Sequence, residues 1–322
     1  MRKWRSEELE QIVCDFCGGR DSAREFIRGD GMRVTECSQC GLAFLNPRPK
    51  TAFIERFYGA DYFTGVSADK GEGGLHCSAE RTTNNSQDKH LPRPMWILEN
   101  KFKGIRGKKV LEIGCATGDL LLALKERGAQ VKGVEISDFA ASVARCKDID
   151  VITGTIEDFV VDHSEKYDIV IALQVVEHVP NPTQFFHNIA HLLKEGGVLL
   201  LSTPNYSCVK RFGPKWFGFN ASYEHLYFFS LQILKKIGIE SGLHLKYIES
   251  SQLITFPEKI INFYEQLIQK KNTLLYVVRE IGFAATLETM LKKSSGYYSF
   301  AIGHIMTIVF EKKPRSHRSV VL

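Results

Sequence analysis

The feature that most constrains this chain is a repeated alternation of short apolar runs with amphipathic stretches between residues 109 and 250. Apolar and β-branched runs bounded by turn residues predict strands. Strand-like runs occupy residues 109–113, 130–135, 167–174, 198–203 and 243–250, and helical stretches between them occupy residues 119–126, 138–146, 182–193 and 230–241. Such alternation is typical of a parallel sheet covered by helices on both faces. The sequence therefore predicts an α/β fold.

Two C-x2-C pairs near the start of the chain predict a second, smaller unit. The first pair is Cys14 with Cys17, and the second is Cys37 with Cys40. Four thiolates at this spacing suit a tetrahedral Zn²⁺ ion, and a complete set of protein ligands indicates a structural ion and not a catalytic one. Short strands at 24–27 and 32–36 would form a hairpin between the pairs. The alternative is a small hairpin with four unligated cysteines.

Composition shifts and turn residues divide the rest of the chain. Glycine, proline and polar residues dominate the stretch before residue 95, which predicts a mobile connection. The expected units are a zinc ribbon at 1–50, a linker or lid at 51–94, an α/β core at 95–252, a helical insertion at 253–300, a last core strand at 301–314 and a tail at 315–322. Two apolar helices, 257–269 and 273–292, make the insertion a cap on the body; the alternative is peripheral membrane contact by residues 257–293.

The charge balance of the chain does not indicate a nucleic acid or another polyanion as a partner. The chain has 42 Lys and Arg against 37 Asp and Glu, a net charge of +5, and its densest basic run lies at 312–318. A solvated terminus accounts for that run, so no nucleic-acid surface is indicated. No apolar stretch is long enough for a transmembrane helix, and the first residues include acids, so we expect a cytoplasmic protein. Nothing in the sequence indicates the oligomeric state.

The segment Val-Leu-Glu-Ile-Gly-Cys-Ala-Thr-Gly-Asp at 110–119 has the form of a cofactor loop. An apolar strand runs into a tight turn of small residues and then a helix, whose first N–H groups point toward the turn. The dinucleotide pattern G-x-G-x-x-G is not met, because Asp119 stands where its last glycine would fall, and the chain has no phosphate-binding P-loop motif. A different cofactor is therefore indicated.

On these residues the chain resembles the class I S-adenosylmethionine-dependent methyltransferases. The first motif of that family is an acid two positions before a G-x-G-x-G turn, and Glu112 with Gly114, Ala116 and Gly118 fits it with one alanine replacement. Residues 154–159, 167–179 and 192–200 are similar to the later motifs. The resemblance covers roughly residues 95–250 and 300–313, and implies a Rossmann-like, mostly parallel seven-stranded sheet.

The resemblance implies S-adenosylmethionine as cofactor. Glu112 would help to organise its amino group, Glu135 would accept hydrogen bonds from the ribose hydroxyls, and Asp158 would accept one from the adenine amino group. The implied cofactor-binding set is Glu112, Gly114, Cys115, Ala116, Gly118, Glu135, Ile136, Glu157, Asp158 and Gln174. Each acid taken alone also fits a local cap or ion pair at a strand end.

The candidate catalytic residues lie in two short segments. Glu177 and His178 form a dipeptide that shapes the pocket in that family. His225 lies in the stretch Tyr-Glu-His-Leu-Tyr-Phe-Phe-Ser at 223–230, where it is the candidate general base, with Tyr223 or Tyr227 positioning the substrate. The alternatives are substrate binding or strand-end capping for His225, and packing for His178.

This segment and the cysteine-rich start together resemble bacterial methyltransferases of sugar and glycan pathways. The resemblance implies a small-molecule, glycan-linked or nucleotide-sugar acceptor that is methylated at oxygen, carbon or nitrogen. Two other functions remain open from the residues alone. One is an RNA methyltransferase whose zinc ribbon grips nucleic acid, and the other is a non-catalytic cofactor-binding assembly protein.

Overall fold

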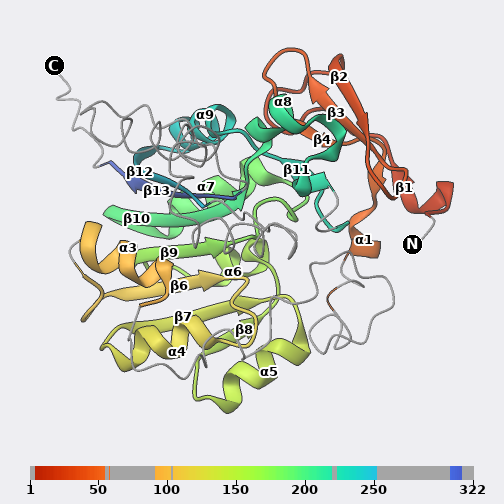
Figure 1. The fold of residues 1–322 in the computed structure, drawn as a ribbon. Coiled ribbons are helices and arrows are strands. Elements are labelled where there is room, and N and C mark those ends of the chain that lie inside the picture. The colour runs from red at the N-terminus through yellow and green to blue at the C-terminus, as the bar shows by residue number, and fades with distance from the viewer. Residues whose placement is uncertain are drawn as a thin grey trace, which may run out of the picture.

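The computed structural model describes residues 4–54, 58, 91–102, 104–219, 223–251 and 305–313. Most of the expected linker, the helical insertion with its suggested membrane contact, and the tail lie outside these described residues. The described part contains a large mixed sheet with flanking helices and a smaller, mainly N-terminal sheet at one side of it (Figure 1).

The large sheet has seven strands in the order β12-β13-β10-β9-β6-β7-β8. The strands are β6 (Lys109–Ile113), β7 (Gln130–Glu135), β8 (Val151–Thr153), β9 (Tyr167–Leu173), β10 (Leu193–Pro204), β12 (Leu243–Ser251) and β13 (Ile305–Lys312). Strand β13 alone runs antiparallel to its neighbours β10 and β12. The predicted mostly parallel seven-stranded sheet is confirmed, and the short strand β8 lies at its edge.

Helices cover both faces of this sheet, which explains why its strands are apolar on both sides. The helices are α3 (Arg93–Lys101), α4 (Asp119–Glu126), α5 (Asp138–Cys146), α6 (Ile156–Asp162), α7 (Pro182–Leu192) and α9 (Leu231–Glu240). Val110 of β6 packs in one core with α3, α4 and α5, whereas its neighbour Leu111 packs in the other with α6, α7 and α9. Successive strand residues thus face opposite layers.

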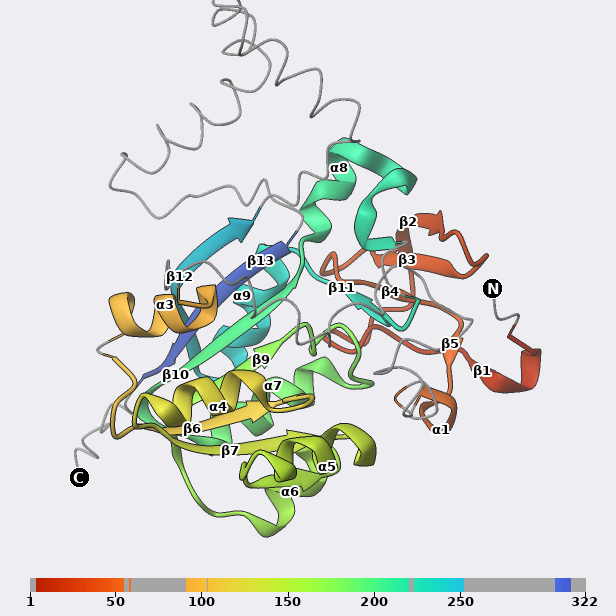
Figure 2. The same ribbon diagram turned by 60° about the horizontal axis from the view of Figure 1, so that its bottom comes forward.

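The N-terminal sheet is completed by a strand from the body of the protein. Its order is β11-β4-β3-β2, with β2 (Ser22–Ile27), β3 (Arg33–Cys37), β4 (Ala43–Leu45) and β11 (Tyr227–Phe228). The hairpin expected between the cysteine pairs is present as β2 and β3. Both ribbon views place β11 beside β4 (Figures 1 and 2). The N-terminal module therefore shares its sheet with a segment of the larger body.

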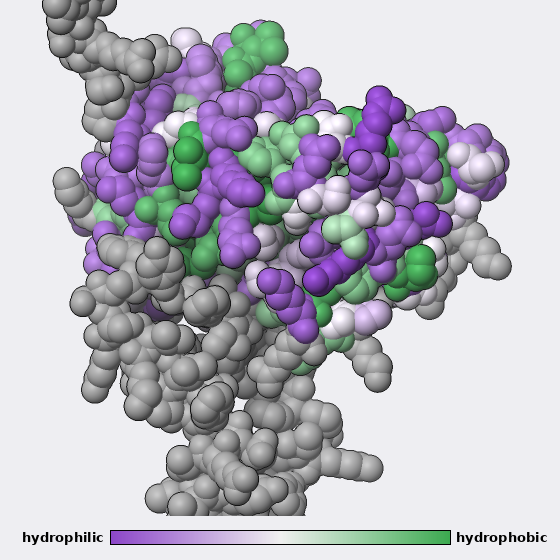
Figure 3. Space-filling model, turned by 90° about the horizontal axis from the view of Figure 1, so that it is seen from above, coloured by the Kyte–Doolittle hydropathy of each residue, from purple (hydrophilic) through white to green (hydrophobic). Residues whose placement is uncertain are grey.

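Short elements connect these parts. They are η1 (Ser6–Glu8), β1 (Leu9–Glu10), β5 (Arg48–Pro49), α1 (Thr51–Ile54), η5 (Tyr206–Cys208), α8 (Val209–Phe212), η6 (Gly213–Lys215) and η7 (Phe217–Phe219). Strands β1 and β5 pair with each other. In the face seen in Figure 3, hydrophilic side chains intermingle with small groups of hydrophobic ones. None of the helices in the described ranges has the length and apolar character that crossing a bilayer requires.

Candidate cofactor and catalytic site

The four N-terminal cysteines converge. The Sγ atoms of Cys14, Cys17, Cys37 and Cys40 all lie within 4.8 Å of one another, and no disulfide joins them. Cys14 Sγ is 3.4 Å from Cys40 Sγ, and Cys17 Sγ is 3.5 Å from Cys37 Sγ. Four sulfurs around a tetrahedral Zn²⁺ at about 2.3 Å would be about 3.8 Å apart. The arrangement therefore fits the expected metal site.

The lack of a side chain at Gly19 leaves room for two of these sulfur atoms. A Cβ atom added at Gly19 would lie 2.9 Å from Cys37 Sγ and 3.3 Å from Cys17 Sγ. The hydrogen bond with Cys40 and burial both raise the pKa of the Cys14 thiol. Deprotonating four adjacent thiols is thus unfavourable in free energy unless a cation lies between them.

The candidate cofactor edge is formed where two neighbouring parallel strands end. Glu112 lies in β6, and Glu135 is the last residue of β7. Gly114 and Gly118 adopt φ values of 70° and 75°, which favour glycine. Glu135 ties the turn to its own strand, because its Oε2 accepts a hydrogen bond from the backbone N–H of Ala116 at 2.8 Å.

Glu112 is a buried acid with an unused acceptor. Its Oε2 is enclosed and has no hydrogen-bond partner. Burial, and then the negative charges of Glu135 and Asp119, raise the pKa of Glu112 to about 8. A buried carboxyl group in this state is suited to meet a donor or a cation from a ligand. The Glu112 carboxyl group therefore fits the positively charged amino group of S-adenosylmethionine.

Glu135 is also buried, and its surroundings act on its pKa in opposite directions. Burial raises the pKa, whereas the backbone N–H groups of Ser137 and Ala116 lower it. Ser137 N donates to Glu135 Oε1 at 2.9 Å. The carboxylate is therefore held in one orientation at the strand end. Cys115 and Ile136, both expected near the cofactor, are respectively buried and half-buried beside these groups.

The residues expected near the adenine lie at the start of α6, where Asp158 forms a helix cap. Asp158 Oδ2 accepts hydrogen bonds from Thr155 N at 3.1 Å and Thr155 Oγ1 at 2.7 Å, and these bonds lower the pKa of Asp158. Thr155 Oγ1 in turn accepts from Asp158 N. Glu157 is half-buried in the first turn of the same helix. Asp158 thus makes the local helix cap that the sequence left open as an alternative. Adenine recognition by Asp158 stays a prediction.

Gln174 begins the loop between β9 and α7, which links the cofactor edge to the candidate catalytic residues. Its φ is 56°, and its Nε2 donates to Ser202 Oγ at 3.1 Å. A Cβ added at Gly114 would lie 2.6 Å from Val175 Cγ2. The glycine turn therefore contacts the loop that continues to Glu177 and His178.

Three titratable side chains meet in this region. Glu177, His178 and His225 each present an atom within 4.8 Å of the other two. The two imidazole centroids are 4.7 Å apart, edge to face, and His225 Nε2 is 4.0 Å from Glu177 Oε1. His225 is only 4% exposed, and its Nδ1 lies 3.4 Å from Gly218 O. The two histidines predicted from separate segments are thus neighbours.

Glu177 is the least solvated member of this cluster. It is 1% exposed, and neither carboxylate oxygen has a partner in hydrogen-bond geometry. Burial raises its pKa to about 8, although the nearby hydroxyl of Thr203 acts in the lowering direction. A neutral Glu177 can become the counter-ion of a protonated histidine when a proton moves within the cluster.

Two tyrosines, Tyr58 and Tyr223, lie beside this cluster. The hydroxyl of Tyr58 lies 3.0 Å from His178 Nδ1, a contact that no sequence pattern indicated. Tyr223 is half-buried beside His225, and its backbone carbonyl accepts a hydrogen bond from Arg28. Substrate positioning by the side chain of Tyr223 remains a prediction.

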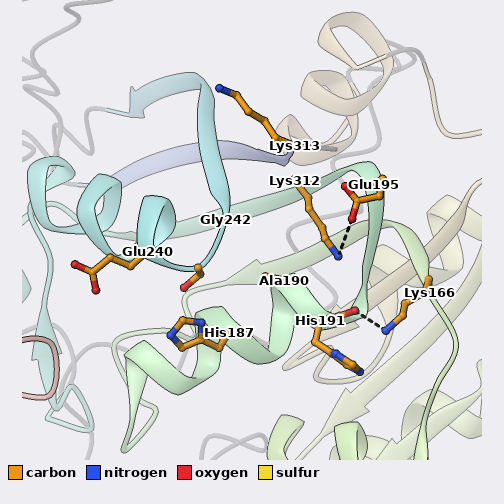
Figure 4. Close-up of a pocket in the computed structure, with 10 residues that line it drawn as sticks. Lys166, His187, Ala190, His191, Glu195, Glu240, Gly242, Lys312 and Lys313 are labelled. Atoms are coloured by element: carbon orange, nitrogen blue, oxygen red, sulfur yellow. Dashed lines mark hydrogen bonds and ion pairs between the residues drawn. The ribbon is translucent and has the colours of Figure 1, made fainter. Parts of the chain in front are cut away.

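A cavity of about 660 Å³ lies elsewhere (Figure 4). Its lining comes from α7, the end of α9, the residues that precede β9 and β12, the start of β10 and the end of the antiparallel β13. The cavity therefore lies at the opposite end of the parallel strands from Gly114. The lining residues are Lys166, His187, Ala190, His191, Glu195, Glu240, Ser241, Gly242, Lys312 and Lys313. None of the candidate site residues belongs to it.

Comparisons with known proteins find relatives over the central part of the chain. Residues 91–247 match the family model described as a methyltransferase domain. A ubiquinone biosynthesis O-methyltransferase of Actinobacillus pleuropneumoniae is 38% identical over 128 residues, which cover 36% of this chain and 55% of the relative. One from Salmonella arizonae is 28% identical over 178 residues, covering 53% and 68%. The chain spans about half the length of the first of these curated relatives.

Solved structures include a similar chain. Magnesium protoporphyrin IX methyltransferase from Synechocystis, with bound S-adenosylhomocysteine, has a TM-score of 0.47 and 14% identity, covering 82% of this chain and 100% of that one. The match to the methyltransferase-domain model covers just under half of the chain, and it includes the strands and turns of the candidate cofactor edge. The match and the strand order agree with the resemblance to class I S-adenosylmethionine-dependent methyltransferases that the motifs around Glu112 indicated.

Proposed function

We propose that this chain transfers a methyl group from S-adenosylmethionine to a hydroxyl group of a small-molecule acceptor. The buried, unpartnered Glu112 Oε2 beside the glycine turn is the observation that carries the proposal. S-adenosylmethionine supplies a methyl group on a positively charged sulfur, which is open to attack by a nucleophile. The relatives named as O-methyltransferases support oxygen as the acceptor atom.

The chain's own residues would bind and orient the cofactor. Glu112 would accept from its amino group, and Glu135 would accept from the ribose hydroxyls while Ala116 N and Ser137 N hold the carboxylate in place. For an in-line displacement, alignment of the two reactants and exclusion of water are the main contributions of an enzyme. Burial of both carboxylates supports such a closed site.

His225 would remove the acceptor proton. A neutral imidazole suits this task, and Glu177, whose Oε1 lies 4.0 Å from His225 Nε2, would stabilise in its ionised form the imidazolium that forms. His178, in edge contact with His225, would orient its ring. The resemblance to sugar-pathway methyltransferases supports a glycan-linked or nucleotide-sugar hydroxyl as the finer acceptor class.

The direct test is formation of S-adenosylhomocysteine with a panel of hydroxylated acceptors that includes nucleotide sugars and phenols. Methylation of a hydroxyl supports the proposal, and methylation at carbon or nitrogen would correct the acceptor atom. Turnover only with RNA would favour the nucleic-acid alternative. Tight cofactor binding without turnover on any acceptor would favour a non-catalytic assembly protein.

Replacement of His225 by glutamine is expected to reduce kcat by about 10²- to 10⁴-fold, the usual contribution of a general base. Cofactor affinity should stay unchanged, because the proposed cofactor contacts are made by Glu112 and Glu135 and not by His225. Steady-state kinetics and calorimetry measure the two quantities. His191→Gln, in the cavity at the opposite end of the parallel strands, is the matched control. Full turnover by His225→Gln would remove the base role.

Cofactor binding is expected to strengthen as the pH rises from about 6 to about 7. Glu112 is protonated in the free protein below its pKa of about 8, and must lose that proton to accept from a charged amino group. Affinity should therefore rise with pH by up to about tenfold per unit in this window. Calorimetry in buffers of different ionisation enthalpy would detect the released proton. With Glu112→Gln the dependence should be flat; an equal slope in both proteins would contradict this assignment.

A further inference from the structure

Residues 223–229, which we call the His225 segment, are held by the N-terminal module. Tyr227 and Phe228 pair with Phe44 and Ala43 as the edge strand β11 of the module's sheet. The backbone N–H of Leu45 donates to Leu226 O at 2.9 Å. The candidate base thus lies two residues before a strand that is paired with residues near the start of the sequence.

Arg28 makes the most direct of these connections. It lies between β2 and β3, and its side chain is fully buried. Its Nη1 donates to His225 O and its Nη2 to Tyr223 O, both at 3.0 Å. The guanidinium group also lies 5.5 Å from the centre of the Tyr223 ring. One side chain therefore binds the backbone on both sides of residue 224.

Asp30 fixes the orientation of this guanidinium group. Its two carboxylate oxygens accept from Arg28 Nε at 3.1 Å and Nη2 at 2.5 Å. Asp30 Oδ1 also accepts from the backbone N–H of Met32, so the carboxylate is fixed to the turn. A planar group with donors in a fixed fork can meet a carboxylate and two carbonyl oxygens at once, which an ammonium group cannot do in one geometry.

We propose that Arg28 is a positioning residue that sets the location of the His225 imidazole in the candidate active site. By fixing the carbonyls of Tyr223 and His225, it restricts the backbone torsions that direct the His225 side chain toward Glu177. The functional part of this inference rests on the proposed role of His225. Within the described residues, the side-chain hydrogen bonds given for Arg28 go to Asp30, Tyr223 and His225, all outside the cofactor edge, so we expect cofactor binding to be independent of Arg28.

Other contacts join the module to the body without Arg28. Arg48 Nη1 donates to Pro180 O at 2.6 Å and to Tyr227 Oη at 3.1 Å. Asp15 Oδ2 accepts from the backbone N–H of Thr183 at 2.8 Å. These contacts should keep the module docked when Arg28 is replaced. A change confined to the His225 segment can therefore be separated from loss of docking.

The experiment uses the full chain with two replacements and one control. Arg28→Lys keeps the charge but lacks the fork. Arg28→Met combined with Asp30→Asn removes the pair without leaving a buried carboxylate unpaired, and the asparagine oxygen can still accept from Met32 N. Arg33→Met is the control, since Arg33 forms an exposed ion pair with Glu25 in the same module. Zinc content and cofactor affinity are measured for each protein.

The decisive readouts are the imidazole NMR signals of His225, assigned with His225→Gln, and amide exchange over residues 223–229. Both changes at Arg28 should shift the His225 signals and accelerate exchange in this segment by about tenfold or more. The control should resemble the natural sequence. Where an acceptor has been found, kcat should fall by about tenfold or more with KM little changed. Cofactor affinity and zinc content should remain within about twofold.

Unchanged His225 signals and unchanged exchange in both Arg28 variants would overturn the proposal. General acceleration of exchange across the module, with loss of zinc, would also overturn it, because Arg28 would then act on the whole module and not on the His225 segment. Failure of the natural protein to bind S-adenosylmethionine would reject the proposed function instead. The NMR and exchange results would still decide the role of Arg28.

Discussion

Replacing Cys37 with serine is expected to abolish stoichiometric zinc binding and to unfold the N-terminal module. Cys37 is buried at the end of β3, with its Sγ 3.5 Å from that of Cys17. Binding of structural zinc contributes about 10–16 kcal/mol in zinc-finger peptides, and this energy is coupled to folding. Loss of one of four thiolates should therefore remove most of the stability of this small unit.

The consequences should reach the candidate active site. Because β11 pairs with β4, unfolding of the module would leave the His225 segment without its sheet partner. We expect turnover to be lost, whereas cofactor binding at β6 and β7 should persist in weakened form. Metal analysis should fall from about one zinc ion per chain to almost none. The melting temperature should fall by about 10 °C or more.

Cys146→Ser is the matched control for this prediction. Cys146 is exposed at the end of α5 and lies outside the four-cysteine cluster. Its replacement should change neither zinc content nor melting temperature. If Cys37→Ser kept both its metal and its melting temperature, the cluster would not be a structural zinc site. Absence of zinc in the natural protein after purification under reducing conditions would lead to the same conclusion.

Replacing Glu135 with glutamine is expected to weaken cofactor binding by about 100-fold. Hydrogen bonds to a charged group contribute about 1.5–3 kcal/mol each, and two bonds to ribose hydroxyls would be weakened. The amide would also present an NH₂ group to either Ala116 N or Ser137 N, both of which now donate to the carboxylate. The turn that carries Gly114 and Gly118 should therefore shift as well.

Calorimetry with S-adenosylhomocysteine would measure this effect without any acceptor. Asp138→Asn removes an exposed acid in the first turn of α5, three residues beyond Glu135, and serves as the control for charge alone. Its affinity should stay within about twofold of the natural protein. Equal losses in both variants would indicate a general electrostatic effect, and no loss with Glu135→Gln would reject the ribose contact.

The cofactor edge could be predicted from the sequence because its parts are local. Glu112, Gly114 and Gly118 lie within one strand, turn and helix, and a parallel sheet brings the end of β7 with Glu135 to the same edge. The cysteine cluster was equally accessible, since two C-x2-C turns joined by a hairpin have few ways to converge. In the same way, Asp158 could be located, although the sequence could not distinguish its helix-capping role from a ligand contact.

The candidate catalytic cluster of Glu177, His178 and His225 depends on contacts between distant segments. His178 and His225 were predicted separately, and nothing in the sequence indicated that their rings lie 4.7 Å apart or that Tyr58 contacts one of them. The burial that raises the pKa of Glu177 to about 8 comes from the surrounding fold, not from its neighbours in the chain. Titration properties of this kind require a three-dimensional environment.

The sequence by itself therefore determined the sheet, the glycine turn after β6 and the grouping of the cysteines, because short-range periodicity and spacing encode them. Only the tertiary structure decided that the cysteine-rich module shares its sheet with the His225 segment. The hydrogen bond from Arg28 to His225 O spans 197 positions in the chain. No local pattern specifies such a contact, since it exists only after the N-terminal module has packed against the body and brought the two segments together.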